Sequence, residues 1–320
     1  MTRIHTIDLL DQGTPGSIAA YLVEDGGEPV LIETGPSATF AALEAGLARL
    51  GLRVEDVRHA LVTHIHFDHA GAAGHLARRG ATIYVHEFGA RHLIDPSRLV
   101  ASARRIYGEQ MDARWGPILP VPAGQIRSVH DGDVLTFGAI TLRAIETPGH
   151  ARHHHAYALE TDDGTVCFTG DVAAAFVPGC AFISLPTPPP EFDLEQWLGS
   201  IDRLDRSGFV RLYPTHFGVV ADPGAHLERV RRELIAHTAL IRSCLEQGVP
   251  EERIRAIYRQ FQRELADGLG LPPFRRRFYA SDAFAAMNVT GILRFLRKSE
   301  SAPTSRAIPE LSGSRGSSSG

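Results

Sequence analysis

The chain has 320 residues, of which 43% are hydrophobic and 22% are charged, and its formal net charge at neutral pH is −4. These values are typical of globular proteins and exclude a chain that is disordered or fibrous as a whole. This net charge does not predict a surface that binds nucleic acid. The absence of an apolar run of 18 residues predicts that no segment spans a membrane. Three scattered cysteines and an N-terminus without a secretory signal favour a reducing, cytoplasmic setting.

The first part of the chain alternates predicted strands and helices, which places it in the α/β class. In chain order the predicted elements are two strands within 18–34, a helix at 38–50, a strand at 59–63, a helix at 70–79 and a strand at 81–86. Gly51 and Gly80 directly follow the two helices, as is typical of helix ends.

Residues 87–122 depart from this alternation. Two helix-like segments, 87–94 and 97–111, lead into Trp115 and a proline-rich stretch, which indicates a helical insertion. Beyond the insertion we expect strands at 134–146, 155–160 and 165–169, a helix at 191–206 and a last short strand at 209–213.

From Pro223 onward the hydrophobic residues follow a helical period, so residues 221–298 are predicted to form a helical extension. This segment holds 14 basic and 9 acidic side chains, a net charge of +5 (14 − 9). We interpret its basic face as solvated surface and not as a nucleic-acid site, because the basic residues show no interleaved aromatic pattern of the kind that nucleic-acid sites have. The serine-rich residues 299–320 are predicted to be a disordered tail.

Two composition facts narrow the chemistry. Lys298 is the only lysine, against 32 arginines (33 − 1), which excludes a phosphate-binding loop built on Gly-Lys and a Schiff-base lysine in the body of the protein. The chain also has 16 histidines, several of them clustered. Histidine is the commonest metal ligand, so the clusters indicate where to look for a metal site.

The densest cluster is the segment Thr-His-Ile-His-Phe-Asp-His, which ends at His69. His64 and His66 are two residues apart, so in an extended segment both rings point to the same side. Asp68 and His69 follow at the turn from strand to helix. Because four candidate ligands fall within six residues, this segment predicts a metal site and not a group of surface histidines.

Three further candidates stand directly after predicted strands. His150 follows Thr-Pro-Gly, Asp171 follows Phe-Thr-Gly, and His216 follows Tyr-Pro-Thr. Side chains at successive strand ends converge on one edge of a sheet. A catalytic zinc-like ion needs about three protein ligands and an open position, so these residues could complete such a site.

These four motifs in this order resemble the metallo-β-lactamase superfamily, over residues 18–220 or so. The resemblance implies an αββα sandwich of the α/β class with a C-terminal helical extension, and residues 1–220 as the catalytic domain with the insertion at 87–122 near its site. It also implies the ligand sets: His64, His66 and His150 for a first metal, Asp68, His69 and His216 for a second, and Asp171 as a bridge between them.

The remaining histidines are expected to play other parts. We interpret His154 as a supporting residue that orients a ligand or the bridging acid. His153 and His155 are expected to be structural or exposed, and His86 is not expected to be a ligand. Surface positions are predicted for His5, His59, His75, His92, His130, His226 and His237.

The resemblance implies a dinuclear hydrolase, closest in kind to lactonase and glyoxalase II-like members. Two divalent cations would activate a water as hydroxide, which attacks a carboxylic ester, lactone or thioester. Zinc is favoured, and iron or manganese would also suit these ligands. Asp68 and Asp171 are the expected catalytic residues, and Glu33 is expected to support the site without binding metal.

Other features bear on the substrate. Familiar zinc β-lactamases tend to have cysteine where Asp171 stands and often anchor the substrate with lysine, and this chain has neither feature. The segment after Asp171 also lacks the Gly- and Arg-rich sequence of relatives that hydrolyse glutathione thioesters. Five mostly apolar residues either line the pocket or hold the insertion down: Ile106, Tyr107, Trp115, Phe176 and Phe182. If they line it, the small-molecule substrate is uncharged and partly hydrophobic.

Two alternatives to a hydrolase stay open at this point. One is an iron-dependent redox enzyme on the same fold. The other is a non-catalytic, metal-binding regulatory protein whose C-terminal helices recognise a partner. These helices could equally cover the pocket or form a homodimer.

Overall fold

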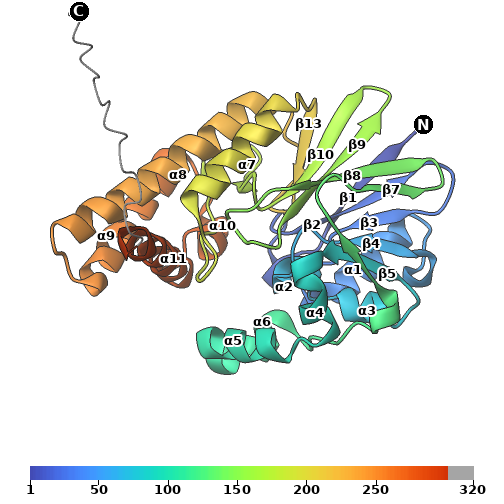
Figure 1. The fold of residues 1–320 in the computed structure, drawn as a ribbon, viewed down its shortest axis with the longest axis horizontal. Helices are drawn as coiled ribbons and strands as arrows, with labels where there is room; N and C mark the ends of the chain where they lie inside the picture. Colours follow the sequence, from blue (N-terminus) through green and yellow to red (C-terminus); the bar gives the residue numbers. More distant parts are fainter. Residues whose placement is uncertain (302–320) are drawn as a thin grey trace, which may run out of the picture.

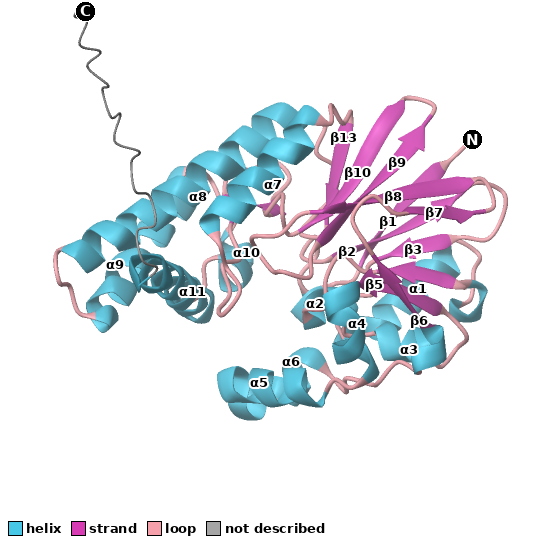
Figure 2. Cartoon of the chain, viewed as in Figure 1, coloured by secondary structure: helices cyan, strands magenta, loops and turns pink. Residues whose placement is uncertain are grey.

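Two β-sheets packed face to face, with helices over both outer faces, make up the computed structural model (Figure 1, Figure 2). The structure describes residues 1–301. The tail predicted at 299–320 therefore lies outside the described residues, except for its first three residues, which end the last helix. The αββα sandwich with helices appended at its C-terminal end is confirmed.

The first sheet has six strands in the order β1-β2-β3-β4-β5-β6. Their bounds are β1 Arg3–Asp8, β2 Ala19–Glu24, β3 Val30–Ile32, β4 His59–Leu61, β5 Thr82–His86 and β6 Ile126–Val129. The first three strands are antiparallel, and β3 to β6 are parallel. Parallel neighbours need crossovers, which α1 (Phe40–Arg49), α2 (Phe67–Ala70), α3 (Ala73–Ala77) and α4 (Glu87–Ile94) provide.

The second sheet has five strands in the order β13-β10-β9-β8-β7. Their bounds are β7 Val134–Phe137, β8 Ile140–Glu146, β9 His155–Thr161, β10 Gly164–Gly170 and β13 Arg211–Pro214. β9 is antiparallel to both of its neighbours, and β10 and β13 are parallel. Consequently β8, β10 and β13 all run in one direction, and their carboxyl ends meet at one edge of the sandwich.

The predicted elements are largely present, with a few differences. The sequence pattern missed β1, β6 and the short strands β11 (Ala175–Phe176) and β12 (Ile183–Ser184). The strand predicted at 134–146 is in fact the hairpin of β7 and β8, whose turn contains Gly138 at φ 59°. A positive φ at this position suits glycine.

The strand β2 shows how the sandwich buries both faces of a sheet. Tyr21 and Val23 belong to the apolar layer between the two sheets, while Ala20 and Leu22 belong to the layer under the helices. Because successive side chains point to opposite faces, such a strand must be apolar throughout. That continuous apolar run is why the sequence identified β2 correctly.

Helices of the second half cover the other sheet. α7 (Leu194–Arg206) and α8 (Pro223–Glu246) pack on its outer face, and Trp197 of α7 is fully buried there. The extension continues with α9 (Glu251–Gly268), α10 (Pro273–Tyr279) and α11 (Asp282–Ser301). α11 packs against both α8 and α9, and α9 and α11 lie farther from the sheets than α7 does (Figure 1).

The segment predicted as an insertion divides into two parts. α4 packs on the first sheet with Ala90 and Leu93 buried. α5 (Ser97–Tyr107) and α6 (Met111–Trp115) lie away from the sheets (Figure 1). The boundaries at residues 87–122, 220 and 298 remain predictions. Within residues 1–301, no helix is long and apolar enough to cross a membrane.

Replacing Trp197 tests how far the second sheet depends on α7. The Trp197→Ala change removes a fully buried ring and the hydrogen bond from its Nε1 to the carbonyl oxygen of Val172, 2.8 Å long. We expect the free energy of unfolding to fall by about 3–5 kcal/mol, measured by urea unfolding followed by circular dichroism. The control Phe274→Ala, at a ring that is 53% exposed, should change it by less than about 0.5 kcal/mol. Equal midpoints for the two variants would contradict this packing.

Candidate metal centre

The seven predicted ligands gather at one edge of the sandwich, where strands of both sheets end. His64 and His66 follow β4 of the first sheet. His150, Asp171 and His216 follow β8, β10 and β13 of the second sheet. Three groups of these side chains have ligand atoms within 4.8 Å of one another: His64, His66 and His150; His64, His69 and Asp171; Asp68, His69 and His216.

The first group consists of three imidazoles. Nε2 of His64 lies 2.9 Å from Nδ1 of His66 and 3.2 Å from Nε2 of His150, and the latter two atoms are 2.9 Å apart. Nitrogen ligands around a tetrahedral zinc ion are about 3.3 Å apart, given zinc–nitrogen bonds of about 2.0–2.1 Å. The three rings are therefore spaced much as ligands of one ion would be.

Hydrogen bonds fix which ring nitrogens carry the protons. Nδ1 of His150 lies 2.8 Å from the carbonyl oxygen of Pro186, which can only accept, so this nitrogen carries a proton. The Thr63 hydroxyl donates to Glu33 over 2.5 Å, which leaves its oxygen to accept from Nδ1 of His64. In both neutral rings Nε2 is then a bare lone pair. Two lone pairs that face each other at 3.2 Å repel unless a proton or a metal ion lies between them.

The group of Asp68, His69 and His216, called the second group from here on, is made of two imidazoles and a carboxylate. Nδ1 of His69 donates to Glu33 over 3.0 Å, and Nδ1 of His216 donates to the carbonyl oxygen of Ser17 over 2.9 Å. Both Nε2 atoms therefore point inward. They lie 3.9 Å and 3.5 Å from Oδ2 of Asp68, a residue whose side chain is 25% exposed.

Asp171 stands between the two groups. Its Oδ1 lies 3.3 Å from Nε2 of His69 and 3.5 Å from Nε2 of His216. Its Oδ2 lies 3.3 Å from Nε2 of His150, in the first group. One oxygen thus faces each group, which is the arrangement that a bridging carboxylate requires.

The local charges act in opposite directions on the two groups. Burial and the neighbouring imidazoles hold the pKa of His64 well below its usual range, and burial lowers the pKa of His66 to about 3. Burial also lowers the pKa of His69, but Asp171 and Glu33 outweigh it and raise that pKa well above its usual value. The first group therefore stays neutral and the second group favours positive charge.

The residues present fit a bound metal. Nε2 of His69 and Oδ1 of Asp171 are buried, yet within the described residues neither has a hydrogen-bond partner. Buried polar atoms are rarely left unpaired in folded proteins. Imidazole nitrogens and carboxylate oxygens are ligands of zinc, iron and manganese, so a divalent ion would satisfy both atoms.

Glu33 supports the centre without reaching the inward-facing nitrogens. Its fully buried carboxylate accepts hydrogen bonds from the hydroxyls of Thr63 and Thr215 and from Nδ1 of His69. The backbone of Glu33 has φ 68°, an unusual value for a residue other than glycine. This agrees with the supporting role expected from the sequence.

His154 has the contacts of a supporting residue. The backbone N–H of Asp171 donates to its Nε2 over 3.1 Å, and its Nδ1 donates to the Thr147 hydroxyl over 2.7 Å. His153 contacts Glu191 at 3.2 Å, and His155 is buried beside His86 with ring centroids 4.4 Å apart. None of these three has a place in the three ligand groups found among the described residues.

Two of the seven histidines that were predicted to lie at the surface are buried, so the prediction was wrong for them. His226 and His237 of α8 are only 6% and 2% exposed. Nε2 of His226 donates to the carbonyl oxygen of Ala173, and Nδ1 of His237 lies 2.7 Å from the hydroxyl of Tyr258. Each ring is buried because it has a polar partner inside the protein.

The residues proposed to line the pocket separate into two kinds. Trp115 and Phe182 are buried and hold their segments down, while the Ile106 side chain lies outside the described residues. Tyr107 packs against Trp115, and burial and the charge of Asp68 raise its pKa to about 12. A fixed positive charge lies next to these residues, because the guanidinium of Arg114 lies over Trp115, 4.3 Å from the ring centroid.

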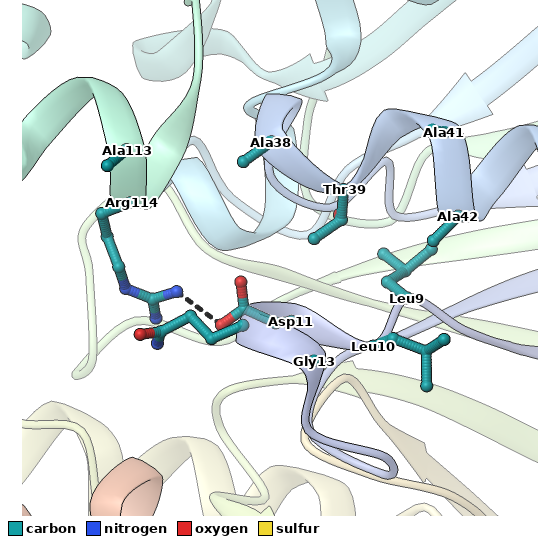
Figure 3. Close-up of a pocket in the computed structure, with 11 residues that line it drawn as sticks. Leu9, Leu10, Asp11, Gly13, Ala38, Thr39, Ala41, Ala42, Ala113 and Arg114 are labelled. Carbon is teal, nitrogen blue, oxygen red and sulfur yellow. Dashed lines mark hydrogen bonds and ion pairs between the residues drawn. The ribbon is translucent and has the colours of Figure 1, made fainter.

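A separate hollow of about 370 Å³ lies beside this arginine (Figure 3). Leu9, Gly13 and Ala42 are among its lining residues, and Asp11 pairs with Arg114 at 2.5 Å on its wall. The predicted metal ligands are not among the residues that line it in the described part of the chain. The hollow is therefore not the metal centre.

Several residues that form hydrogen bonds with the predicted ligands could not be identified from the sequence. The carbonyl oxygens of Ser17 and Pro186 accept hydrogen bonds from His216 and His150. A backbone carbonyl is present in every residue, so composition and spacing cannot reveal such a role. Thr63 and Thr215 could have been found, because each directly precedes a predicted histidine ligand.

Comparison with known families agrees with this geometry. A family model described as "Metallo-beta-lactamase superfamily" matches residues 13–216. The crystal structure of the metallo-beta-lactamase family protein TTHA1429 from Thermus thermophilus superposes with a TM-score of 0.64 and 26% identity, over 93% of this chain and 94% of that chain.

Two curated relatives match over a smaller share of their length. The metallo-beta-lactamase fold-containing protein ST1585 of Sulfurisphaera tokodaii is 28% identical over 47% of this chain and 56% of its own. The atrochrysone carboxyl ACP thioesterase of Aspergillus fumigatus is 28% identical over 65% of this chain and 55% of its own. The chain thus spans little more than half the length of these relatives.

Removing the Glu33 carboxylate tests its supporting role. Glu33→Ala leaves the donors of Thr63, Thr215 and His69 without their acceptor, and each unpaired buried donor costs about 1–3 kcal/mol. We expect the free energy of unfolding of the metal-free protein to fall by more than about 3 kcal/mol, measured by urea unfolding. Glu33→Gln should have a free energy of unfolding between those of the wild type and Glu33→Ala.

Glu28 provides the matched control, five residues earlier on the same strand–turn segment. Its side chain is 65% exposed and contacts His59, so Glu28→Ala should change the free energy of unfolding by less than about 1 kcal/mol. If Glu33→Ala unfolded at the same urea concentration as Glu28→Ala, the supporting role would be wrong.

Proposed function

Because the chain belongs to the metallo-β-lactamase superfamily, we propose that it is a dinuclear metal-dependent hydrolase of carboxylic esters, lactones or thioesters. The observation that carries the proposal is the convergence of histidine ring nitrogens on two adjacent points, with one oxygen of Asp171 facing each point. Such an arrangement has no use in a protein that binds no cation.

The proposed ligand sets follow the two groups. His64, His66 and His150 would hold the first ion, and Asp68, His69 and His216 would hold the second, with Asp171 shared between them. When bound, two such ions supply a nucleophile from water near neutral pH and polarise the substrate's carbonyl oxygen. Zinc is the proposed metal, since neutral imidazole and carboxylate groups suit it well.

The chain's own residues would complete the reaction site. Burial raises the pKa of Asp68, but His69 and His216 outweigh it and hold that pKa below its usual range, so this carboxylate stays ionised. From the exposed side of the centre it would orient the attacking water. Tyr107, whose pKa is about 12, keeps its hydroxyl proton near neutral pH and would donate a hydrogen bond to the oxygen on which charge develops.

The thioesterase among the curated relatives supports an acyl substrate. Hydrolysis of β-lactams is less well supported, because the chain has aspartate at position 171 and its single lysine is near the C-terminal end of α11. Aromatic side chains next to the centre, among them Phe67 and Tyr107, favour a small substrate with an apolar acyl part.

Metal content and substrate turnover test the proposal together. We expect elemental analysis to find about two divalent ions per chain, and a panel of lactones and acyl thioesters to include at least one that is hydrolysed. Chelation and Asp171→Ala should each reduce turnover by at least about a thousandfold. His130→Ala, at an exposed histidine outside the centre, should leave metal content and turnover unchanged.

Three results would contradict the proposal. Oxygen uptake with the visible absorption of bound iron would indicate the redox alternative. A metal-dependent protein partner without turnover of any substrate would favour the regulatory alternative. A chain that binds no metal after incubation with zinc, iron or manganese would remove the basis of all three functions.

Tyr107→Phe tests the proposed hydrogen-bond donor. Because the pKa is about 12, the hydroxyl stays protonated at neutral pH, so its loss should lower kcat/KM about tenfold by the same factor between about pH 6 and pH 9. Tyr84→Phe, on β5, removes a hydroxyl that contacts His59 on the opposite side of the fold and is the control. A pH-dependent loss, or an equal loss in the control, would rule out this role.

A further inference from the structure

His150 differs from three other predicted histidine ligands in the part of the chain that accepts the hydrogen bond from its Nδ1. His64, His69 and His216 are oriented through Nδ1 by Thr63, Glu33 and Ser17, which belong to the sandwich or its β1–β2 loop. His150 is oriented by the carbonyl oxygen of Pro186, which lies 2.8 Å from its Nδ1. This oxygen belongs to the proline-rich segment between β12 and α7.

The C-terminal helix α11 holds this segment directly after Pro186. The backbone N–H of Thr187 donates to Oδ1 of Asn288 over 2.9 Å, and the Thr187 hydroxyl donates to the backbone carbonyl oxygen of Asn288 over 3.3 Å. One turn later, Gly291 lies so close that a Cβ there would overlap the carbonyl oxygen of Thr187. Two adjacent turns of α11 thus fix the position of Thr187.

Asn288 is in turn held by the other helices of the extension. Its Nδ2 donates to the hydroxyl of Tyr258 on α9 over 3.3 Å, and that hydroxyl lies 2.7 Å from Nδ1 of His237 on α8. Asn288 and Tyr258 are fully buried, and His237 is 2% exposed. A buried polar chain therefore runs from α8 through α9 and α11 to the residue next to Pro186.

We propose that Asn288 is a positioning residue for the metal ligand His150, so that the helical extension is part of the apparatus that assembles the first metal site. The proposal rests on the metal centre of the proposed function and not on its substrate. Asn288 fixes Thr187, the adjoining peptide presents the Pro186 carbonyl, and that carbonyl sets the proton position and rotation of the His150 ring. Outer partners of this kind typically change metal affinity by about 10- to 100-fold.

The affinity of each metal site is the decisive measurement. Full-length protein carrying Asn288→Leu, which removes the acceptor for Thr187, is titrated with Zn²⁺ in competition with chelators and loaded with Co²⁺ for visible absorption spectra. We expect the Zn²⁺ affinity of one site to fall about tenfold or more, with the other within about twofold of wild type. The Co²⁺ spectrum of the weakened site should change as well.

Two further variants separate positioning from general stability. Asn288→Asp keeps an oxygen acceptor for the Thr187 N–H and should restore most of the affinity. Leu296 lies on the same helix and is 3% exposed. Leu296→Ala should therefore lower the melting temperature while leaving the metal affinities of both sites unchanged.

Each outcome bears on the proposal. Wild-type affinity at both sites in Asn288→Leu would overturn it, as would an equal loss at one site in Leu296→Ala or no recovery in Asn288→Asp. If Asn288→Leu did not fold, Asn288→Ala would decide in its place, since it also removes the side-chain oxygen that accepts from the Thr187 N–H. Failure of the wild-type protein to bind metal would instead overturn the proposed function.

Discussion

The buried carboxylate of Glu33 is the constraint on which the rest of the metal edge depends. It follows β3 of the first sheet, and it accepts hydrogen bonds from Thr63, after β4, and from Thr215, after β13 of the second sheet. One side chain thus joins the loops of both sheets. Two tyrosines act in the same way: Tyr21 of β2 donates to the carbonyl of Pro214, and Tyr157 of β9 donates to that of Val62. The loops that carry the ligands are therefore fixed across the sandwich and do not depend on local structure alone.

Such a site is costly for the fold without a cation. The Nε2 atoms of His64 and His150 face one another, while the buried carboxylate of Asp171 and the partly exposed carboxylate of Asp68 lie beside His69. A protein that had only to be stable would replace such a cluster with apolar residues. Its presence beside a well-packed apolar interior indicates that the strain serves function, because local rules are normally broken only at functional sites.

The proposed ligands could be picked out in the sequence because the segments that carry them come after strands, and strand ends are readable from apolar runs. Their supporting carbonyls could not, since no side chain marks them. The strands β1 and β6 were missed because both lie at the edges of their sheet and bury only a few of their residues over a short length. The burial of His237, by contrast, was readable: it lies three residues after Leu234 and four before Ile241, on the same apolar stripe of α8.

The parts added to the sandwich meet close to the metal edge. Arg114 of α6 lies over Trp115 and, at 5.6 Å, over the ring of Phe278 on α10, which is 6.3 Å from the ring of His216. Asp11, only 1% exposed, holds the guanidinium in place. The sandwich thus carries the proposed ligands, whereas the region between α5–α6 and α10 carries aromatic and cationic groups that a substrate of the proposed reaction would meet. Since ligand geometry and surroundings come from different segments of the chain, the surroundings can change in sequence without loss of the metal site, and substrate choice should follow α6 and α10 and not the strands.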